Sequence, residues 1–334
     1  MSGLVAASAD DERADDASIE DELFGVGVGE AMREGDIESE SEDEAAAQSS
    51  AAASRRRRVV ERVALDSISA EAFLRDYSRP NKPVLIINAD AVLPMHLDVA
   101  FFRAHYGEKC IPLEINSLRA KTNVPLKEFL SFENAELNKL YLRSVHLAEW
   151  FSGAAEDVEL PSVLGSNFLA STPDAAWPES WRKWIEVFIC HRDCDGFPFL
   201  HRDILNTHAY SMQLQGTKEF VFFAPSDARF LYPQAASRGG ISQNRSAIPD
   251  WRSVDSREFP LFQFAKPIVV RVQPGEMLYI PSNWWHTARC VSEEPSVTFG
   301  GNFVDETVRE AFLDAFAENR AMCSLANVGG SRMQ

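Results

Sequence analysis

Two side chains able to bind a metal stand two positions apart in the segment His201-Arg-Asp203. In an extended backbone, residues at this spacing leave the same face of the chain. One imidazole and one carboxylate are two members of a facial triad, which holds Fe(II) and leaves three coordination positions open. The third ligand should be a second histidine, distant in sequence and close in space. The candidate is His286, which ends the run Pro281-Ser-Asn-Trp-Trp-His.

A His-x-Asp pair alone is a weak signal, because short motifs arise by chance. Taken by itself, His201 is better explained as a surface or capping histidine. Lys218 strengthens the metal-site hypothesis, because it opens the apolar run Glu-Phe-Val-Phe-Phe-Ala, where a buried cation is costly unless it meets an anion. An acidic co-substrate would supply the anion, and a surface lysine is the alternative. Thr298 lies in Ser-Val-Thr-Phe-Gly-Gly, and its hydroxyl could reach the same anion if this run is a strand.

Four features together resemble the JmjC domain, in its small hydroxylase type. They are His201-x-Asp203, Gly216-x-Lys218, Pro281-x-x-Trp-Trp-His286 and Thr298. The resemblance covers residues 68–304. It implies a mainly β fold with flanking helices, built on a double-stranded β-helix (jelly-roll or cupin) core. It also implies Fe(II) and 2-oxoglutarate as cofactors.

The resemblance implies a role for each of these side chains. His201, Asp203 and His286 resemble the iron ligands. Lys218 resembles the lysine that pairs with the distal carboxylate of 2-oxoglutarate, and Thr298 resembles its hydroxyl partner. The resemblance therefore implies a site with a metal end and an anion end.

Three further positions bear on the co-substrate. Tyr141, in Leu-Tyr-Leu-Arg-Ser, is similar to a tyrosine of the asparaginyl-hydroxylase branch that also reaches the distal carboxylate. Pro198 stands where many relatives have a threonine that binds 2-oxoglutarate. Ser211 stands where many relatives have an asparagine. Because neither departure removes a metal ligand, they bear on co-substrate affinity more than on the fold.

The implied activity is that of a dioxygenase, which couples decarboxylation of 2-oxoglutarate to hydroxylation of a C–H bond. We expect the substrate to be a side chain of an intracellular protein, with histones and translation-related proteins as candidate classes. Three alternatives remain open: demethylation of N-methyl lysine or arginine, tRNA hydroxylation, and a non-catalytic cupin-like binding protein. A gain of one oxygen or a loss of a methyl group would separate hydroxylation from demethylation.

The charge of the chain is concentrated at one end. The 334 residues carry a formal net charge of −17, and residues 1–54, with sixteen acidic and two basic side chains, account for −14 of it. This segment is rich in Ala, Ser, Asp and Glu, which predicts a disordered tail. The nearly neutral remainder lacks the basic stripe that a phosphate backbone requires, which disfavours a nucleic-acid partner.

The cysteines and the apolar runs indicate a compartment. Five scattered cysteines form no even framework and no C-x-x-C motif, and no run of eighteen apolar residues occurs. We therefore expect no membrane span and an intracellular location, in the nucleus, the cytoplasm or both. The run Arg55–Arg58 is either a nuclear import signal or a basic collar for the acidic tail. Cys190 and Cys194 are interpreted as small buried apolar residues rather than a zinc pair.

The chain divides into four predicted parts. They are a disordered acidic tail ending in an Arg run (1–58), a helix and strand region (59–185), the double-stranded β-helix core (186–304) and a C-terminal helix and tail (305–334). The polar segment 226–265 is long for a loop, so we expect it to shape substrate access. The apolar spacing over 305–322 predicts an amphipathic helix that packs on the barrel, with a homodimer contact as the alternative.

Four residues between the first two motifs are secondary candidates. If the chain stays extended after Asp203, His208 lies on the opposite face, and a hydrogen-bonded core histidine is favoured over a substrate contact. Tyr210 shares that parity and could line the pocket, but packing is the favoured interpretation. Asn206 and Thr207 could position a substrate, with no pattern behind the assignment.

Overall fold

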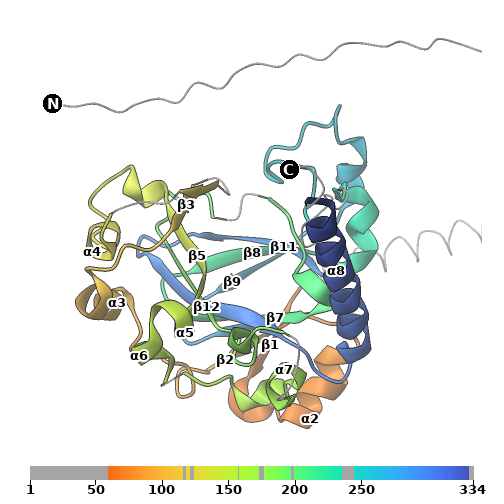
Figure 1. Ribbon diagram of the computed structural model, residues 1–334, viewed down its shortest axis with the longest axis horizontal. Coiled ribbons are helices and arrows are strands. Elements are labelled where there is room, and N and C mark those ends of the chain that lie inside the picture. The colour runs from red at the N-terminus through yellow and green to blue at the C-terminus, as the bar shows by residue number, and fades with distance from the viewer. Residues whose placement is uncertain are drawn as a thin grey trace, which may run out of the picture. The chain divides into compact units, whose positions relative to one another are not determined.

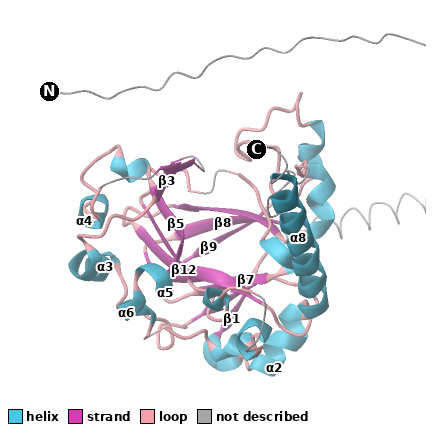
Figure 2. Ribbon diagram, viewed as in Figure 1, coloured by secondary structure: helices cyan, strands magenta, loops and turns pink. Residues whose placement is uncertain are grey.

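The β-strands in the described part of the chain form two sheets, which lie at the centre of the computed structural model (Figure 1). The structure describes residues 59–330 apart from 116–117, 121–123, 157, 173–176, 197–198 and 235–243. Within this part of the chain, one sheet has nine strands in the order β1-β2-β10-β7-β12-β6-β5-β3-β4, and the other has three in the order β11-β8-β9. Helices flank the sheets (Figure 2), so the predicted mainly β fold with flanking helices is confirmed. The predicted acidic tail lies outside the described residues.

The nine-stranded sheet takes strands from the whole length of the described chain. Its strands are β1 (Glu61–Ala64), β2 (Val84–Ile87), β3 (Leu113–Ile115), β4 (Leu118–Ala120), β5 (Tyr141–His146), β6 (Glu186–Cys190), β7 (His208–Gln215), β10 (Met277–Ile280) and β12 (Ser296–Phe303). The three-stranded sheet consists of β8 (Lys218–Phe223), β9 (Ile268–Val272) and β11 (Trp285–Cys290). Strands β1 and β2 are parallel, and the other pairings of the described strands are antiparallel.

Most helices are short and precede or follow strands. The described α-helices are α2 (Ala70–Phe73), α3 (Val99–Tyr106), α4 (Leu126–Phe129), α5 (Leu147–Trp150), α6 (Ser152–Ala155), α7 (Phe168–Ser171) and α8 (Arg309–Gly330). Three begin at capping side chains: the backbone N–H groups of Ala72, Phe101 and Leu169 donate to the side chains of Ser69, Asp98 and Asn167, respectively. These caps fix where the chain leaves its loops and enters α2, α3 and α7.

Burial explains which runs became strands. All residues of β8 and β12 are buried, as expected for strands covered on both faces. Strand β9 instead alternates buried and exposed residues, which suits its position at an edge of the small sheet. Gly301 is required inside β12, because a Cβ atom at this position would lie 1.8 Å from the carbonyl oxygen of Trp184.

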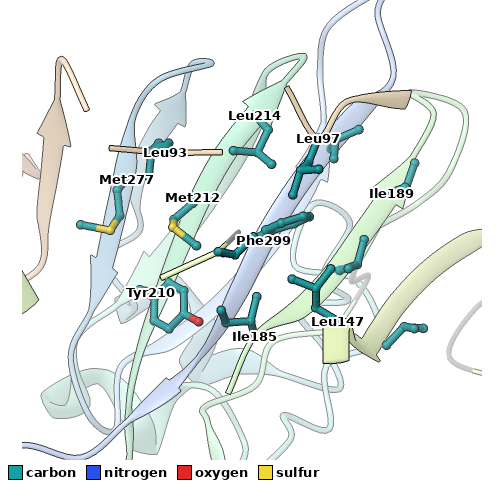
Figure 3. Packing of buried hydrophobic residues seen from close by; sticks show 14 of the residues in the cluster. Leu93, Leu97, Leu147, Ile185, Ile189, Tyr210, Met212, Leu214, Met277 and Phe299 are labelled. Carbon is teal, nitrogen blue, oxygen red and sulfur yellow. The ribbon is translucent and has the colours of Figure 1, made fainter. Parts of the chain in front are cut away.

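One face of the large sheet packs against the helices. Figure 3 shows Met212, Leu214 and Phe299 of β7 and β12 beside Leu97 and Leu147, which precede or begin helices α3 and α5. These side chains belong to the largest buried cluster of the described residues. Burying them holds the large sheet in place, and residues of its other face are free to line a cavity.

Helix α8 lies on the opposite side of the sheets from α3 and α4 (Figure 1). Phe312 is fully buried, and its ring lies 5.6 Å from the ring of Trp177 and 5.8 Å from that of Phe316, centroid to centroid. The predicted packing of this helix on the barrel is confirmed. Its observed bounds, 309–330, lie later in the chain than the predicted 305–322.

The chain does not stay extended from Asp203 to His208, which was the condition for placing His208 on the opposite face. A 3-10 turn, Ile204–Asn206, intervenes, and Leu205 and Asn206 adopt φ values of +56° and +54°. Because of this turn, the sequence spacing of Asp203 and His208 does not indicate on which faces of the chain their side chains lie. The turn also directs the chain sharply into β7 after the candidate metal ligands.

No helix in the described part of the chain combines the length and the hydrophobicity needed to cross a bilayer.

Candidate active site

A cavity of about 350 Å³ is lined by strands of both sheets. Alternate residues of β8 and β11 form one wall, with Phe220 and Ala288 between Lys218 and His286. All seven predicted site residues line this cavity: Tyr141, His201, Asp203, Ser211, Lys218, His286 and Thr298. The sequence therefore identified residues that line one cavity, although Tyr141 and Thr298 lie more than 150 positions apart in the chain.

The backbone brings the two histidines together. The N–H of His201 donates to the carbonyl of His286 over 3.0 Å, and the N–H of His286 donates back over 2.7 Å. Their ring centroids lie 4.3 Å apart. Asp203 follows His201 closely enough for its Oδ2 to lie 4.0 Å from His286 Nε2. Ligand atoms of all three residues lie within 4.8 Å of one another.

The electrostatics of these residues suit a cation. Burial and the nearby His286 lower the pKa of His201 well below its usual value, so its imidazole is neutral and can donate a lone pair. The Nδ1 of His286 lies 3.1 Å from the carbonyl oxygen of Trp284. A hydrogen bond donated there by Nδ1 leaves the Nε2 lone pair facing Asp203.

Two imidazoles and one carboxylate are the donor set preferred by non-haem Fe(II). In the part of the chain that the structure describes, His201, Asp203 and His286 are the one group of three or more such side chains close enough to share an ion. The residues therefore fit the iron that the fold implies.

Lys218 supplies a buried cation at the other end of the cavity. Its side chain is 2% exposed, and its Nζ donates a hydrogen bond to Tyr141 Oη over 3.3 Å. The Nζ also lies 5.5 Å from the ring centroid of Phe188. Burial lowers the pKa of Lys218, and no described acidic side chain forms an ion pair with it. A carboxylate entering the cavity would satisfy this charge.

The strand register fixes the distance between the metal end and the anion end. His286 lies opposite Phe222, and Lys218 lies opposite Cys290. The two functional positions are therefore four residues apart along the paired strands, a separation of about 13 Å at about 3.3 Å per residue. An extended lysine side chain and a short dicarboxylate fit between them.

Thr298 and Ser211 line the cavity, and both have bonding partners within the protein. Thr298 Oγ1 donates to Gln213 Oε1 over 2.9 Å, so its hydroxyl reaches a neighbouring amide. Ser211 pairs through its strand with Leu278 and Gly300. Pro198 lies outside the described residues. Whether Thr298 also meets the co-substrate carboxylate stays a prediction.

Several lining residues were not predicted. The segment 226–265, which we expected to shape access, contributes Asn244 and Arg245 to the cavity wall. Glu186 and Asn302 come from β6 and β12. Burial raises the pKa of Glu186, and Trp184 Nε1 donates to its carboxylate over 3.0 Å. The alternation of β6 and β12 could have indicated them, but only with the pairing register known.

The secondary candidates have structural partners. His208 is fully buried, and its Nδ1 receives the backbone N–H of Ser282 over 3.0 Å, which confirms a hydrogen-bonded core histidine. Asn206 and Thr207 bond to backbone carbonyls. Tyr210 lines the cavity, yet its hydroxyl donates to the carbonyl of Trp184 over 2.6 Å.

Three cysteines lie behind the anion end. Cys190, Cys194 and Cys290 are buried in one cluster with Tyr141. This agrees with the interpretation of Cys190 and Cys194 as buried residues of small volume. None of them belongs to the candidate metal group.

Comparison with known proteins identifies the class. The model of the cupin-like domain family matches residues 69–303 of the chain. The chain therefore belongs to the cupin-like domain family. Within that family its relatives include JmjC proteins, which confirms the resemblance found in the sequence.

The names of the relatives state several activities. Jumonji C domain-containing protein 5 of Drosophila melanogaster is 27% identical over 250 residues, 70% of this chain and 58% of that protein. Lysine-specific demethylase JMJ30 of Arabidopsis thaliana is 30% identical over 249 residues, 70% and 52% of the two chains. 2-oxoglutarate and iron-dependent oxygenase JMJD4 of Gallus gallus is 22% identical over 272 residues, 72% and 59%.

A fourth relative is the tRNA wybutosine-synthesizing protein 5 of Gallus gallus, which is 23% identical over 271 residues, 70% of this chain and 74% of that protein. The matched region spans little more than half the length of the Drosophila and Arabidopsis proteins. The family is thus established, and the names of its members cover more than one substrate class.

Proposed function

We propose that this protein is an Fe(II)- and 2-oxoglutarate-dependent dioxygenase that hydroxylates a side chain of a protein substrate. One observation carries the proposal: a single cavity holds the ligand atoms of His201, Asp203 and His286 at one end and the buried cation of Lys218 at the other. The name of the relative JMJD4, a 2-oxoglutarate and iron-dependent oxygenase, agrees with this assignment.

The residues of the chain divide the work. His201, Asp203 and His286 would hold the iron, and the carboxylate of Asp203 would offset part of its charge. Lys218, with Tyr141 beside it, would bind the distal carboxylate of 2-oxoglutarate. When bound, the iron supplies the activation of dioxygen that oxidation of an unactivated C–H bond requires. The buried strands around the cavity exclude water from the reacting groups.

Demethylation of an N-methyl lysine or arginine is the second candidate, because it uses the same chemistry and JMJ30 is named a lysine-specific demethylase. A tRNA substrate accords with the name of another relative. It is disfavoured by charge, because residues 55–334 carry a net −3 and phosphate binding requires a basic surface. A non-catalytic binding protein would not require the complete set of metal-binding side chains.

We infer a histone or a translation-related protein as substrate, in the nucleus or the cytoplasm. A homodimer through the C-terminal helix would have to use residues of α8 other than Phe312, because the Phe312 side chain is buried within the chain.

The proposal can be tested in one assay. Purified protein is incubated with Fe(II), 2-oxoglutarate and a cell extract, and peptides are mapped by mass spectrometry. We expect a gain of one oxygen on a protein peptide, dependent on 2-oxoglutarate and absent with Asp203→Ala. Loss of a methyl group instead would assign demethylation. Absence of succinate formation with metal-loaded protein and any extract would refute the oxygenase assignment.

A further inference from the structure

Arg245 lies directly opposite a candidate metal ligand. It forms an antiparallel bridge with His201. Backbone hydrogen bonds on either side maintain this pairing. The N–H of Arg202 donates to the backbone carbonyl of Asn244 over 2.9 Å, and the N–H of Ser246 donates to the backbone carbonyl of Leu200 over 2.8 Å. Directly opposed residues of an antiparallel pair project to the same side. The side chain of Arg245 therefore leaves the backbone on the side of the His201 imidazole.

The segment that carries Arg245 is held firmly in the fold. Asn244 Nδ2 donates to the carbonyl of Asp203 over 3.1 Å. Ser246 Oγ donates to the carbonyl of Leu231 and receives the N–H of Ile248 over 3.0 Å. These bonds attach the cavity wall to the metal-binding segment, so Arg245 is positioned before any ligand enters.

The guanidinium of Arg245 lies on an aromatic ring. Its Cζ is 3.9 Å from the ring centroid of Phe199, another residue of the cavity wall. Stacking of this kind covers the face of the guanidinium and leaves the N–H groups at its edge available. Such an edge is suited to a carboxylate, which can accept two parallel hydrogen bonds.

The charge of Arg245 is not cancelled locally. Arg143 lies over the same ring at 5.9 Å, but it forms an ion pair with Glu114. Among the described acidic side chains, none forms an ion pair with Arg245. This corner of the cavity therefore keeps one positive charge, which is costly unless an anion binds.

We propose that Arg245 binds a carboxylate of the protein substrate, on an Asp or Glu at or next to the residue that is oxidised. The inference rests on the proposed function and specifies its substrate class. The co-substrate is the other source of a carboxylate. It is disfavoured because its distal carboxylate has a partner in Lys218, at the opposite end of the cavity from His201.

A binding assay tests the proposal without turnover. The protein is loaded with Mn(II) and 2-oxoglutarate and mixed with capped hexapeptides that carry a central Asp or Glu, or the matched Asn or Gln. Peptides retained after ultrafiltration are counted by mass spectrometry. We expect acidic peptides to be retained at least about tenfold better than their amides, as for one charge-assisted hydrogen-bonded pair.

Three variants locate the effect. Arg245→Gln should abolish the preference for acidic peptides, and Arg245→Lys should keep part of it, because the charge remains while the fork is lost. Arg257→Gln, an equal charge change at an exposed position of the same segment, should leave it intact. Equal melting temperatures show that the variants fold alike.

The outcomes separate the two sources of the carboxylate. If Arg245→Gln weakens 2-oxoglutarate binding and leaves peptide retention unchanged, the carboxylate belongs to the co-substrate and the inference is overturned. Equal retention of acidic and amide peptides by the unmodified protein also overturns it. Failure of that protein to bind Mn(II) or 2-oxoglutarate would instead count against the proposed function.

Discussion

The two candidate iron-binding histidines are joined by their own backbones. Because His201 and His286 exchange a pair of N–H···O hydrogen bonds, the separation of their rings is set by the fold and not by the metal. Ligands that are already in place lose less conformational freedom when an ion binds. Asp203 lies two residues after His201. The pairing of His201 with His286 therefore also brings the carboxylate of Asp203 close to His286.

Substitutions at the two ends of the cavity should have separable effects. Asp203→Ala removes a ligand, so we expect metal affinity and 2-oxoglutarate turnover to fall together, by at least about 100-fold, since even outer partners of metal ligands contribute 10- to 100-fold. Lys218→Met should keep the metal and raise the KM for 2-oxoglutarate by about 10- to 100-fold, the value of one hydrogen bond to a charged group.

Metal content and initial rates at varied 2-oxoglutarate measure the two effects. Arg257→Gln, at an exposed position that does not line the cavity, serves as a control. A Lys218→Met protein that lost its metal would contradict the assignment of separate ends.

Asp305 gives the fold a dependence on acidity. Burial alone would raise its pKa, but hydrogen bonds from His208, Ser78 and Thr307 outweigh burial and hold the pKa well below its usual value. A carboxyl group whose pKa is lower in the folded protein contributes stability above its unfolded pKa of about 3.9, and this contribution disappears as the pH falls towards the lowered value.

We therefore expect Asp305→Asn to lower the free energy of unfolding by roughly 1.5–3 kcal/mol at pH 7. The difference from the unmodified protein should shrink below about pH 4. Urea unfolding at pH 7 and at pH 3 measures it. The same difference at both pH values would mean that the carboxylate charge contributes nothing.

At the scale of single residues, the sequence located the residues of the candidate metal and anion ends of the cavity but not Arg245. His201, Asp203, Lys218 and His286 stand in short motifs that can be found locally. Arg245 pairs with His201 across 43 intervening residues, and no local pattern records that pairing.

The elements explain why the strands were predictable and the turn between them was not. The run Glu-Phe-Val-Phe-Phe of β8 is buried throughout and identifies itself by composition. The 3-10 turn after Asp203 depends on Leu205 in a left-handed conformation, which is uncommon for a leucine. Tertiary contacts fix this turn, since Asn206 Nδ2 donates to the carbonyl of Ala311 in α8 over 3.1 Å.

Helix α8 should therefore contribute to the stability of the barrel. Phe312→Ala empties a fully buried position beside Leu205 and Trp177, and we expect the free energy of unfolding to fall by about 3–5 kcal/mol. Phe264→Ala, at a side chain that is 54% exposed, should change it by less than about 1 kcal/mol. Chemical denaturation measures both. Equal effects would show that α8 does not support the sheet.

The whole molecule combines a nearly neutral folded part with an acidic segment. Residues 57–334 form one unit by their internal contacts, and the cavity lies within it. We predict that deletion of residues 1–54 leaves the melting temperature and Mn(II) affinity unchanged, while elution from an anion exchanger shifts to lower salt, because the formal charge changes from −17 to −3. A lower melting temperature after deletion would indicate that the segment contributes to folding.

The pairing of β8 with β11 has a consequence for chemical selectivity. Since four residues of fixed register separate His286 from Lys218, the co-substrate must match a rigid interval and not an adaptable one. Among homologous 2-oxo diacids, we expect the five-carbon compound to support turnover and oxaloacetate and 2-oxoadipate, one carbon shorter and longer, to do so poorly. Comparable rates for all three would mean that the hydrogen-bond ladder of these strands does not select the length of the acid.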